Sequence, residues 1–243
     1  MTDNGWMSIA AGQFNAGLDA FVAEREQPIE IIAFDACSMA SWEVAHSLRD
    51  RADFMVGSET TVGLDGFHYT EILRALQENP EMETSELADL FAWSAGDYNE
   101  EWTFSVTDIS KIDALSSTID ALATEVLADE ELSSSFLDHR DAARGADHTW
   151  RDYYLDLGDL ARVLSETDEP RLTEHGAAIA AALDDAIPHN YTRQPYRWVG
   201  GLTIYADLSW DYLADYVDGT GASWSQDTQW DDLLVSLAEE REN

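Results

Sequence analysis

The residue with the clearest chemical potential is Cys37, the only cysteine among 243 residues. It follows an apolar run at residues 29–34 and stands two positions after Asp35. An apolar run without alternation predicts a strand buried on both faces. In open parallel sheets, reacting groups gather where strands end, and the partial positive charge of a following helix favours a thiolate. We therefore interpret Cys37 as a candidate nucleophile, the alternative being a buried and inert thiol.

Patterns around Cys37 indicate how the thiol is positioned. Ser38 is suited to cap a helix predicted over residues 39–51, and a second buried strand is predicted over residues 53–58. A strand–helix–strand unit with tight turns is a crossover between parallel strands. We therefore expect an α/β sandwich with a mostly parallel central sheet and flanking helices.

The remainder of the chain is predicted to be mainly helical. Without an internal repeat or a linker, residues 1–243 are expected to form one domain. Apolar spacing and capping residues predict helices at 9–25, 69–77, 84–96, 108–128 and 227–238, two or three helices within 131–187, extended segments at 102–106 and 201–206, and a loop at 190–198.

The segment around Cys37 resembles a known peptidase family. Residues 31–60, IIAFDACSMASWEVAHSLRDRADFMVGSET, are similar to the nucleophile block of the clostripain-like cysteine peptidases. In that block an apolar strand ends in Asp-Ala-Cys, a helix carries a glutamate, and a second strand ends in Gly-Ser-Glu; the caspase signature is a related form. The resemblance implies a caspase-like fold. Weaker similarity covers residues 10–237 in the family's order, with matches at Asp65-Gly66, Tyr69, 154–160, 201–205, Ser225, Thr228 and Trp230.

By this resemblance the chain is expected to be a cysteine-type endopeptidase that cleaves after Arg or Lys. Cys37 would attack the scissile carbonyl as a thiolate, and backbone N–H groups would hold the oxyanion. Asp35 would lie at the floor of the S1 pocket, where a carboxylate binds a basic side chain; its alternative is a turn residue. Peptides or proteins are the expected substrates. No cofactor is expected, although part of the family responds to calcium, for which no ligands can be named.

The family's catalytic histidine has no counterpart before Cys37. In the family it lies upstream of the cysteine in a His-Gly turn, whereas residues 1–36 contain no histidine. We therefore expect the domain to be N-terminally incomplete, with its first strands missing, and this chain alone to be inactive. The histidine is expected from an absent upstream segment. Among the histidines present, we interpret His46 as a helix-surface residue, His175 as a helix residue, and His68, near the expected site, as the one to test.

Three origins are open for such a chain: a processed product of a longer precursor, a truncated reading frame, or a remnant that lost its catalytic base. A second class of function is open as well, because the same fold with an inert thiol could serve as a non-catalytic binding or interaction domain. Thiol reactivity in the presence of an upstream chain distinguishes the two classes.

The chain is extremely acidic, with 49 Asp and Glu against 13 Lys and Arg and a formal net charge of −36. The acidic residues are dispersed, which is typical of a uniformly acidic surface on a folded body. A salt-loving source is expected, the alternative being an ordinary acidic exoprotein. Nucleic acids and anionic membranes are excluded as partners because no basic stripe is present. A single thiol and the absence of a secretion signal or apolar span leave the compartment open.

Overall fold

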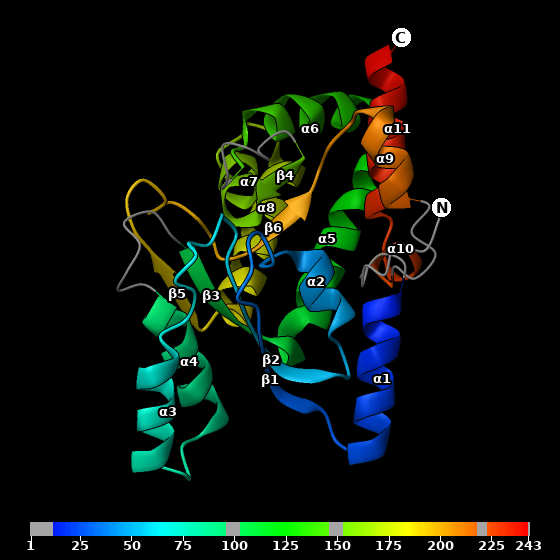
Figure 1. The fold of residues 1–243 in the computed structure, drawn as a ribbon. Helices are drawn as coiled ribbons and strands as arrows, with labels where there is room; N and C mark the ends of the chain where they lie inside the picture. Colours follow the sequence, from blue (N-terminus) through cyan, green and yellow to red (C-terminus); the bar gives the residue numbers. More distant parts are fainter. Residues whose placement is uncertain (1–11, 96–102, 146–152, 218–222, 243) are drawn as a thin grey trace.

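The computed structural model describes residues 12–95, 103–145, 153–217 and 223–242, in which a four-stranded sheet is flanked by helices (Figure 1). The sheet order is β1-β2-β3-β5, and a separate pair is formed by β4 and β6. The strands are β1 (Ile29–Ala33), β2 (Ala52–Gly57), β3 (Thr103–Asp108), β4 (Tyr154–Asp156), β5 (His189–Thr192) and β6 (Thr203–Tyr205).

The predicted crossover is present, because β1, α2 (Trp42–Ser47) and β2 form a unit in which the two strands pair in parallel. The expectation of a mostly parallel sheet is wrong, since β2–β3 and β3–β5 pair antiparallel. The connection explains the difference. Between β1 and β2 a single helix carries the chain back to the end of the sheet where β1 began, so the two strands run parallel. Between β2 and β3 the antiparallel pair α3 (Tyr69–Glu78) and α4 (Thr84–Ser94) brings the chain back to the end where β2 finished, so β3 runs antiparallel (Figure 1).

Apolar clusters cover both faces of the sheet, which confirms the α/β class with flanking helices. On one face, α3 and α4 pack against β2 and β3 through a cluster that contains Val56, Phe104 and Val106. On the other face lies the larger cluster, with α2, α5 (Ile112–Leu127) and α8 (Pro170–Ala186). The apolar residues whose helical spacing predicted α5 form its buried face. They are Ile112, Leu115, Ile119 and Leu122, and all are fully buried.

The other helices lie largely where apolar spacing predicts them. The expected loop at residues 190–198 is partly wrong, because β5 begins it; the polar composition and exposure of β5 hide a strand from pattern analysis. None of the helices in the described ranges combines the length and apolarity that a bilayer crossing requires. The remaining helices are α1 (Gln13–Arg25), the 3-10 helix η2 (Ile109–Lys111), α6 (Glu130–Ala142), α7 (Leu157–Ser165), α9 (Trp210–Val217), α10 (Trp224–Asp227) and α11 (Trp230–Glu242).

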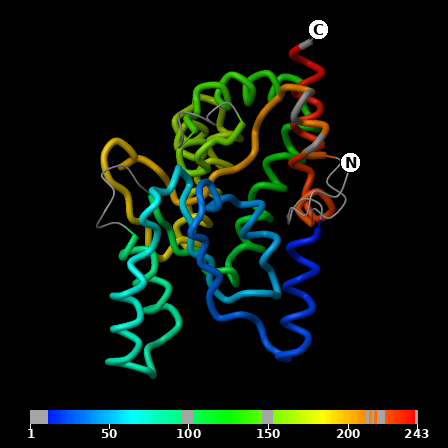
Figure 2. The backbone as a smooth tube through the Cα atoms, viewed as in Figure 1, coloured from blue at the N-terminus to red at the C-terminus, as the bar shows by residue number. Residues whose placement is uncertain are grey.

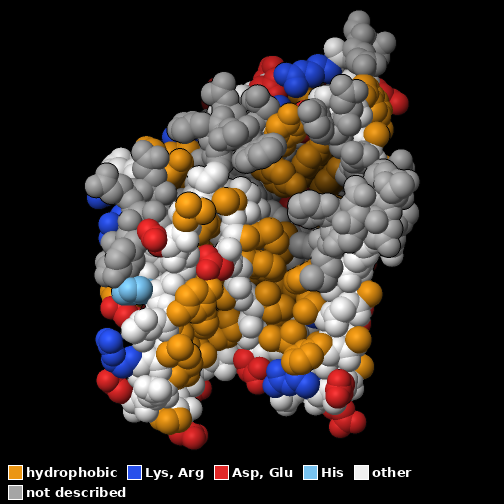
Figure 3. Space-filling model, in the orientation of Figure 1, with side chains coloured by type: hydrophobic (Ala, Val, Ile, Leu, Met, Phe, Trp, Pro, Cys, Tyr) orange, Lys and Arg blue, Asp and Glu red, His pale blue; other side chains and the backbone are white. Residues whose placement is uncertain are grey.

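Strand β1 lies at the edge of the sheet and is not buried on both faces as its composition predicts. It pairs with β2 on one side, and no other strand of the described residues pairs with it. Ile31 and Ile32 point to opposite faces, and both are only half-buried. Figure 3 shows hydrophobic side chains gathered over β1 and the neighbouring α3–α4 pair. Strand β1 therefore has the apolar composition that is typical of an inner strand, although one of its edges is open.

Most of the described arginines form ion pairs with carboxylates at the protein surface. Arg49 contacts Asp113 at 2.7 Å and also Asp227, which ties α2 to α5 and α10. Similar ion pairs join Arg51 to Asp19, Arg162 to Glu166, Arg171 to Asp129 and Arg241 to Asp141, all with N···O distances between 2.6 and 2.8 Å. Because acidic residues greatly outnumber basic ones, most carboxylates have no cationic partner.

This surplus predicts a strong dependence of folding stability on salt. The screening distance shrinks from about 30 Å at 0.01 M to about 3 Å at 1 M salt, so repulsion among the carboxylates falls steeply. We expect the Tm to rise by on the order of 10 °C across that range, because about 1 kcal/mol shifts the Tm of such a domain by a few degrees. Thermal melts followed by circular dichroism in a KCl series measure it. A flat or falling Tm would contradict the salt-loving interpretation.

Candidate active site

Asp35, Ala36 and Cys37 leave the end of β1 as an exposed turn. The helix that follows begins later than predicted. Its N-cap is Ser41, whose hydroxyl accepts the N–H of Val44 at 3.2 Å, and not Ser38, which has a φ of 54°. The first turn of α2 therefore does not adjoin the sulfur, and the expected help of the helix dipole to the thiolate is not supported by this geometry.

Backbone hydrogen bonds fix the turn on two sides. On one side, the N–H groups of Ser38 and Ala40 donate to the carbonyls of Thr60 and Ser58, at 2.9 and 3.0 Å. On the other side, the carbonyl of Ala40 accepts the N–H of Thr203 at 3.0 Å, where β6 begins. The loops that follow β1 and β2 accordingly run together in Figure 2. A nucleophile on such a turn is held by neighbours from two distant parts of the chain.

The sulfur of Cys37 is exposed and receives one backbone donor. The N–H of Val62 lies 3.2 Å from Sγ. A donor aimed at the sulfur stabilises its anionic form, which is the form that attacks a carbonyl. The structure therefore presents the thiol to solvent and does not bury it.

The carboxyl group of Asp35 lies in the same exposed turn. Its Oδ2 accepts a hydrogen bond from the hydroxyl of Tyr69 at 2.7 Å, and this bond raises the pKa of Tyr69. Gly66 lies directly against it: a Cβ at that position would be 2.3 Å from Oδ2, and the φ of +59° also favours glycine. The loop after β2 is thus shaped around the Asp35 carboxylate.

The described histidines bind other groups. His46 was expected on a helix surface, but it is fully buried, with Nδ1 2.9 Å from the Ser223 hydroxyl, and burial lowers its pKa to about 4. All residues of α2 are buried, so this helix has no exposed face for His46 to occupy. His175 lies in α8, as expected, and binds Glu125 at 2.7 Å. His68 precedes α3, with Nδ1 3.1 Å from Glu71, and stays a candidate.

Both glutamates of the resemblance lie under the site, where sequence analysis assigned them no partner. Glu43 lies in the first turn of α2 and is buried; its Oε1 accepts the N–H of Tyr205 at 2.7 Å and the hydroxyl of Tyr216 at 3.2 Å. Burial raises the pKa of Glu43. Glu59 is also buried and accepts the N–H of Gly201 at 2.6 Å. Their occurrence in two short motifs was the available signal, and their partners are more than 100 residues away.

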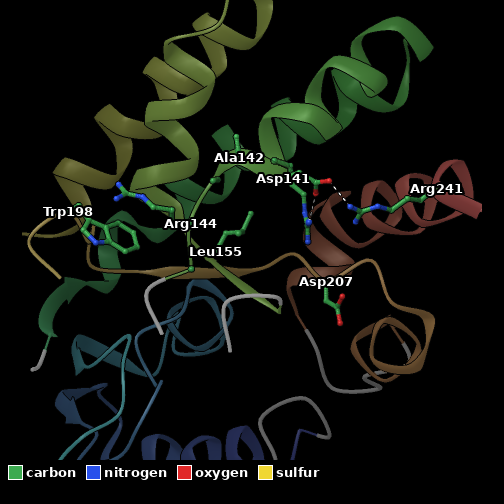
Figure 4. A pocket seen from close by; sticks show the side chains of 10 residues that line it. Asp141, Ala142, Arg144, Leu155, Trp198, Asp207 and Arg241 are labelled. Atoms are coloured by element: carbon green, nitrogen blue, oxygen red, sulfur yellow. Dashed lines mark hydrogen bonds and ion pairs between the residues drawn. The ribbon is translucent and has the colours of Figure 1, made fainter. Parts of the chain in front are cut away.

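A separate cavity of about 780 Å³ lies between the ends of α6 and α11 and the β4–β6 pair (Figure 4). There the guanidinium of Arg144 stacks on Trp198, 3.9 Å from the ring centre, and binds the buried carboxylate of Asp159 at 2.7 Å. The cavity lining does not include Cys37 or Asp35. Within the described ranges, no group of three or more His, Cys, Asp or Glu side chains could hold a metal ion.

An α/β sandwich with an exposed cysteine at the end of the first strand of a crossover is the arrangement of a caspase-like peptidase. The sequence matches the model of the clostripain family over residues 4–236. The chain therefore belongs to the clostripain family of cysteine peptidases. A search of curated proteins found no match.

Solved structures share this fold. A clostripain from Bacteroides thetaiotaomicron, in complex with the peptide inhibitor BTN-VLTK-AOMK, is 22% identical; the match covers 92% of this chain and 95% of that one, with a TM-score of 0.64. The B. fragilis cysteine protease is 16% identical over 95% and 98% of the two chains, with a TM-score of 0.65. An inactive zymogen protease from Parabacteroides distasonis is 20% identical over 86% of this chain and 61% of that one, with a TM-score of 0.62.

Proposed function

We propose that this chain is the cysteine-bearing part of an endopeptidase that cleaves after Arg or Lys, and that its catalytic histidine comes from a segment outside these 243 residues. The observation that carries the proposal is the turn that presents Asp35 and Cys37 together, exposed, at the open end of β1. A carboxylate two residues before an accessible thiol combines recognition of a basic side chain with a nucleophile.

The proposed reaction is acyl transfer. The Cys37 thiolate attacks the carbonyl carbon of the basic residue, and the resulting oxyanion is held by backbone N–H groups of the turn. The histidine protonates the departing amine, so that an acyl-enzyme thioester remains. Water then hydrolyses the thioester and restores the thiol. The Val62 N–H, 3.2 Å from Sγ, supports the first step as a backbone donor that faces the reacting atom.

Asp35 supports specificity for basic residues. Tyr69 binds only Oδ2, and the side chain is otherwise exposed, so a guanidinium or ammonium group can reach the carboxylate. The inhibitor crystallised with the B. thetaiotaomicron clostripain, BTN-VLTK-AOMK, carries a lysine next to its terminal group. That likeness supports, for this chain, a pocket that accepts lysine as well as arginine.

The surface around β1 supports a missing upstream segment. On the face of β1 that meets α4, a cavity of about 520 Å³ is walled largely by apolar side chains, including Ile31 of β1, Phe67 from the loop before α3 and Leu87 of α4. A strand added to β1 would bond its free backbone groups, and helices beside that strand would cover the half-buried isoleucines. The chain spans 95% and 98% of two solved chains but 61% of the zymogen's chain. Longer family chains therefore have residues available for this surface.

Labelling of Cys37 tests the proposal. The complete enzyme, with its upstream segment, should react covalently with a peptidyl acyloxymethyl ketone that carries lysine, and mass spectrometry should place the adduct on Cys37. The Cys37→Ala variant should lose all labelling. A matched peptide with norleucine in place of lysine should label at least tenfold more slowly, because it lacks the charge that Asp35 binds. Absent or sequence-independent labelling would favour the non-catalytic binding domain.

A further inference from the structure

Two buried carboxyl groups meet beneath the candidate active site. Glu59 follows β2 and Asp156 ends β4, and their exposed fractions are 3% and 0%. Glu59 Oε1 accepts the N–H of Gly201 at 2.6 Å, and Asp156 Oδ2 accepts the N–H of Gly200 at 2.6 Å. Asp156 Oδ1 accepts the N–H of Asp159 at 2.5 Å, at the start of α7. Three segments that are distant in the sequence therefore converge on two acids.

Two carboxyl groups in contact cannot both be charged in a buried site, so they share a proton. Burial raises the pKa of Glu59 well above its usual range, and the neighbouring Asp156 raises it further. Burial also raises the pKa of Asp156, to about 6, although hydrogen bonds from Glu59 and from backbone N–H groups oppose this rise. Asp156 is thus the carboxylate at neutral pH. Glu59 is the acid that donates to Asp156, since both Asp156 oxygens already accept backbone N–H groups and the Oε2 of Glu59 accepts none.

The pair closes a ring of contacts around the Cys37 turn. Glu59 belongs to the loop whose Thr60 carbonyl binds Ser38 and whose Val62 N–H binds the sulfur. Across the turn, Gly201 lies two residues before Thr203, which binds Ala40. The Glu59 carboxyl joins these two walls twice, directly through the N–H of Gly201 and through the shared proton to Asp156. A Cβ on Gly158 would be 2.9 Å from the Cα of Gly200, so the start of α7 packs tightly against the segment that carries the second wall.

We propose that Glu59 and Asp156 are positioning residues that hold both walls of the Cys37 turn through one shared proton. Their effect on catalysis rests on the proposed function, whereas their effect on the turn does not. Loss of the proton places two negative charges in contact inside the protein. The link then opens, and the loop that carries Val62 separates from the sulfur.

The other charged groups that face the pair do not change which of the two carboxyl groups holds the proton. Asp159, at the start of α7, adds negative charge beside Asp156, but it is held by Arg144 at 2.7 Å and by Arg162 at 2.9 Å. Arg144 itself lies against Trp198, as Figure 4 shows, and is partly exposed. Because these arginines neutralise Asp159, the proton on Glu59 decides the charge of the pair.

The sign of the pH effect follows from the raised pKa of Glu59. The folded chain keeps this proton above the usual range of about 4.3, whereas the unfolded chain releases it. The stabilising contribution of the group is therefore full below that range and falls as pH rises to its folded pKa. In Glu59→Gln the amide N–H takes the place of the O–H donor and cannot ionise. Asp156→Asn instead turns an acceptor into a donor that faces the N–H of Gly200 or Asp159.

Amide hydrogen exchange at Val62 tests the link in the 243-residue chain, without any need for peptidase activity. The quantity to measure is the exchange rate of the Val62 amide in the wild type divided by its rate in Glu59→Gln. We expect this ratio to be near one at pH 6. Above the pH at which Glu59 loses its proton, the ratio should rise by up to about tenfold per pH unit. Asp156→Asn should exchange faster than both at every pH. Amides of α5, such as that of Leu122, and the exposed control Glu166→Gln should show no such trend.

Two results would overturn the proposal. A Val62 ratio that stays flat to pH 10 would show that no proton links the walls. An equal rise at Leu122 would show that the pair stabilises the whole domain and does not position the turn. In the complete enzyme, Asp156→Asn should lower kcat with little change in KM. Total inactivity of the wild-type complete enzyme would contradict the proposed function and leave the exchange result standing.

Discussion

Residues 1–243 alone should hydrolyse arginyl and lysyl amides about 10²–10⁴-fold more slowly than the same chain assembled with its upstream segment, because that factor is the usual worth of general acid–base help. The sulfur has one backbone donor, and His46, His175 and His189 bind Ser223, Glu125 and Asp89 instead of Cys37. Because these three described histidines are occupied elsewhere, we expect the departing amine to receive no proton from them. Initial rates with fluorogenic amides in high salt, with and without the segment, measure the factor.

The controls separate a missing base from a damaged site. Cys37→Ser in the complete enzyme should fall to background, which shows that the measured rate belongs to the thiol. Robust Cys37-dependent hydrolysis by the 243-residue chain would mean that the base lies within it, and loss of that activity in His68→Ala would identify it. No hydrolysis even after assembly would favour the binding-domain alternative.

Asp35→Asn in the complete enzyme should lower kcat/KM for arginyl substrates by roughly 10²-fold, since it removes the charge of a hydrogen-bonded ion pair. The fold should survive, because the Asn side chain keeps an oxygen that can accept the hydroxyl of Tyr69, now 2.7 Å from Oδ2. Steady-state kinetics with arginyl and lysyl amides measure the loss, and the Tm checks the fold.

Two comparisons make the Asp35 result specific. Asp184→Asn alters an exposed carboxylate on α8 and should leave kcat/KM unchanged. The reaction of Cys37 with iodoacetamide, which has no basic side chain, should be nearly equal in Asp35→Asn and the wild type. Undiminished hydrolysis by Asp35→Asn would remove this residue from the S1 pocket.

Local patterns predicted the part of the fold that depends on local chemistry. Strands β1 and β2, their crossover and the buried stripe of α5 follow from apolar spacing, and Asp35 and Cys37 lie at the end of β1 as expected. A few residues that are neighbours in the sequence are enough to specify such features. The location of the thiol was therefore within reach of the sequence, together with its resemblance to a family whose membership the match at residues 4–236 shows.

Sequence patterns did not predict the features that depend on residues far away in the chain. The antiparallel direction of β3 depends on two helices in its connection, and β5 is a polar strand that forms because β3 offers it an edge. His46 is buried because α10 lies over it, where Ser223 and Asp227 meet its ring. The half-burial of β1 also differs from what its apolar composition predicts, since burial depends on neighbouring elements that composition does not specify.

The ion pairs that hold the arginines bear on how long such an enzyme survives its own activity. A peptidase that cuts after basic residues meets its own chain at every collision between copies, and autolysis limits its lifetime. Self-cleavage after Arg49 would require that side chain to leave both Asp113 and Asp227 before entering a second molecule's pocket. Arg144 would have to leave Asp159 and Trp198. With a single lysine, Lys111, and most of the described arginines held by carboxylates, we expect few cleavable positions in this chain for the specificity that Asp35 is proposed to confer.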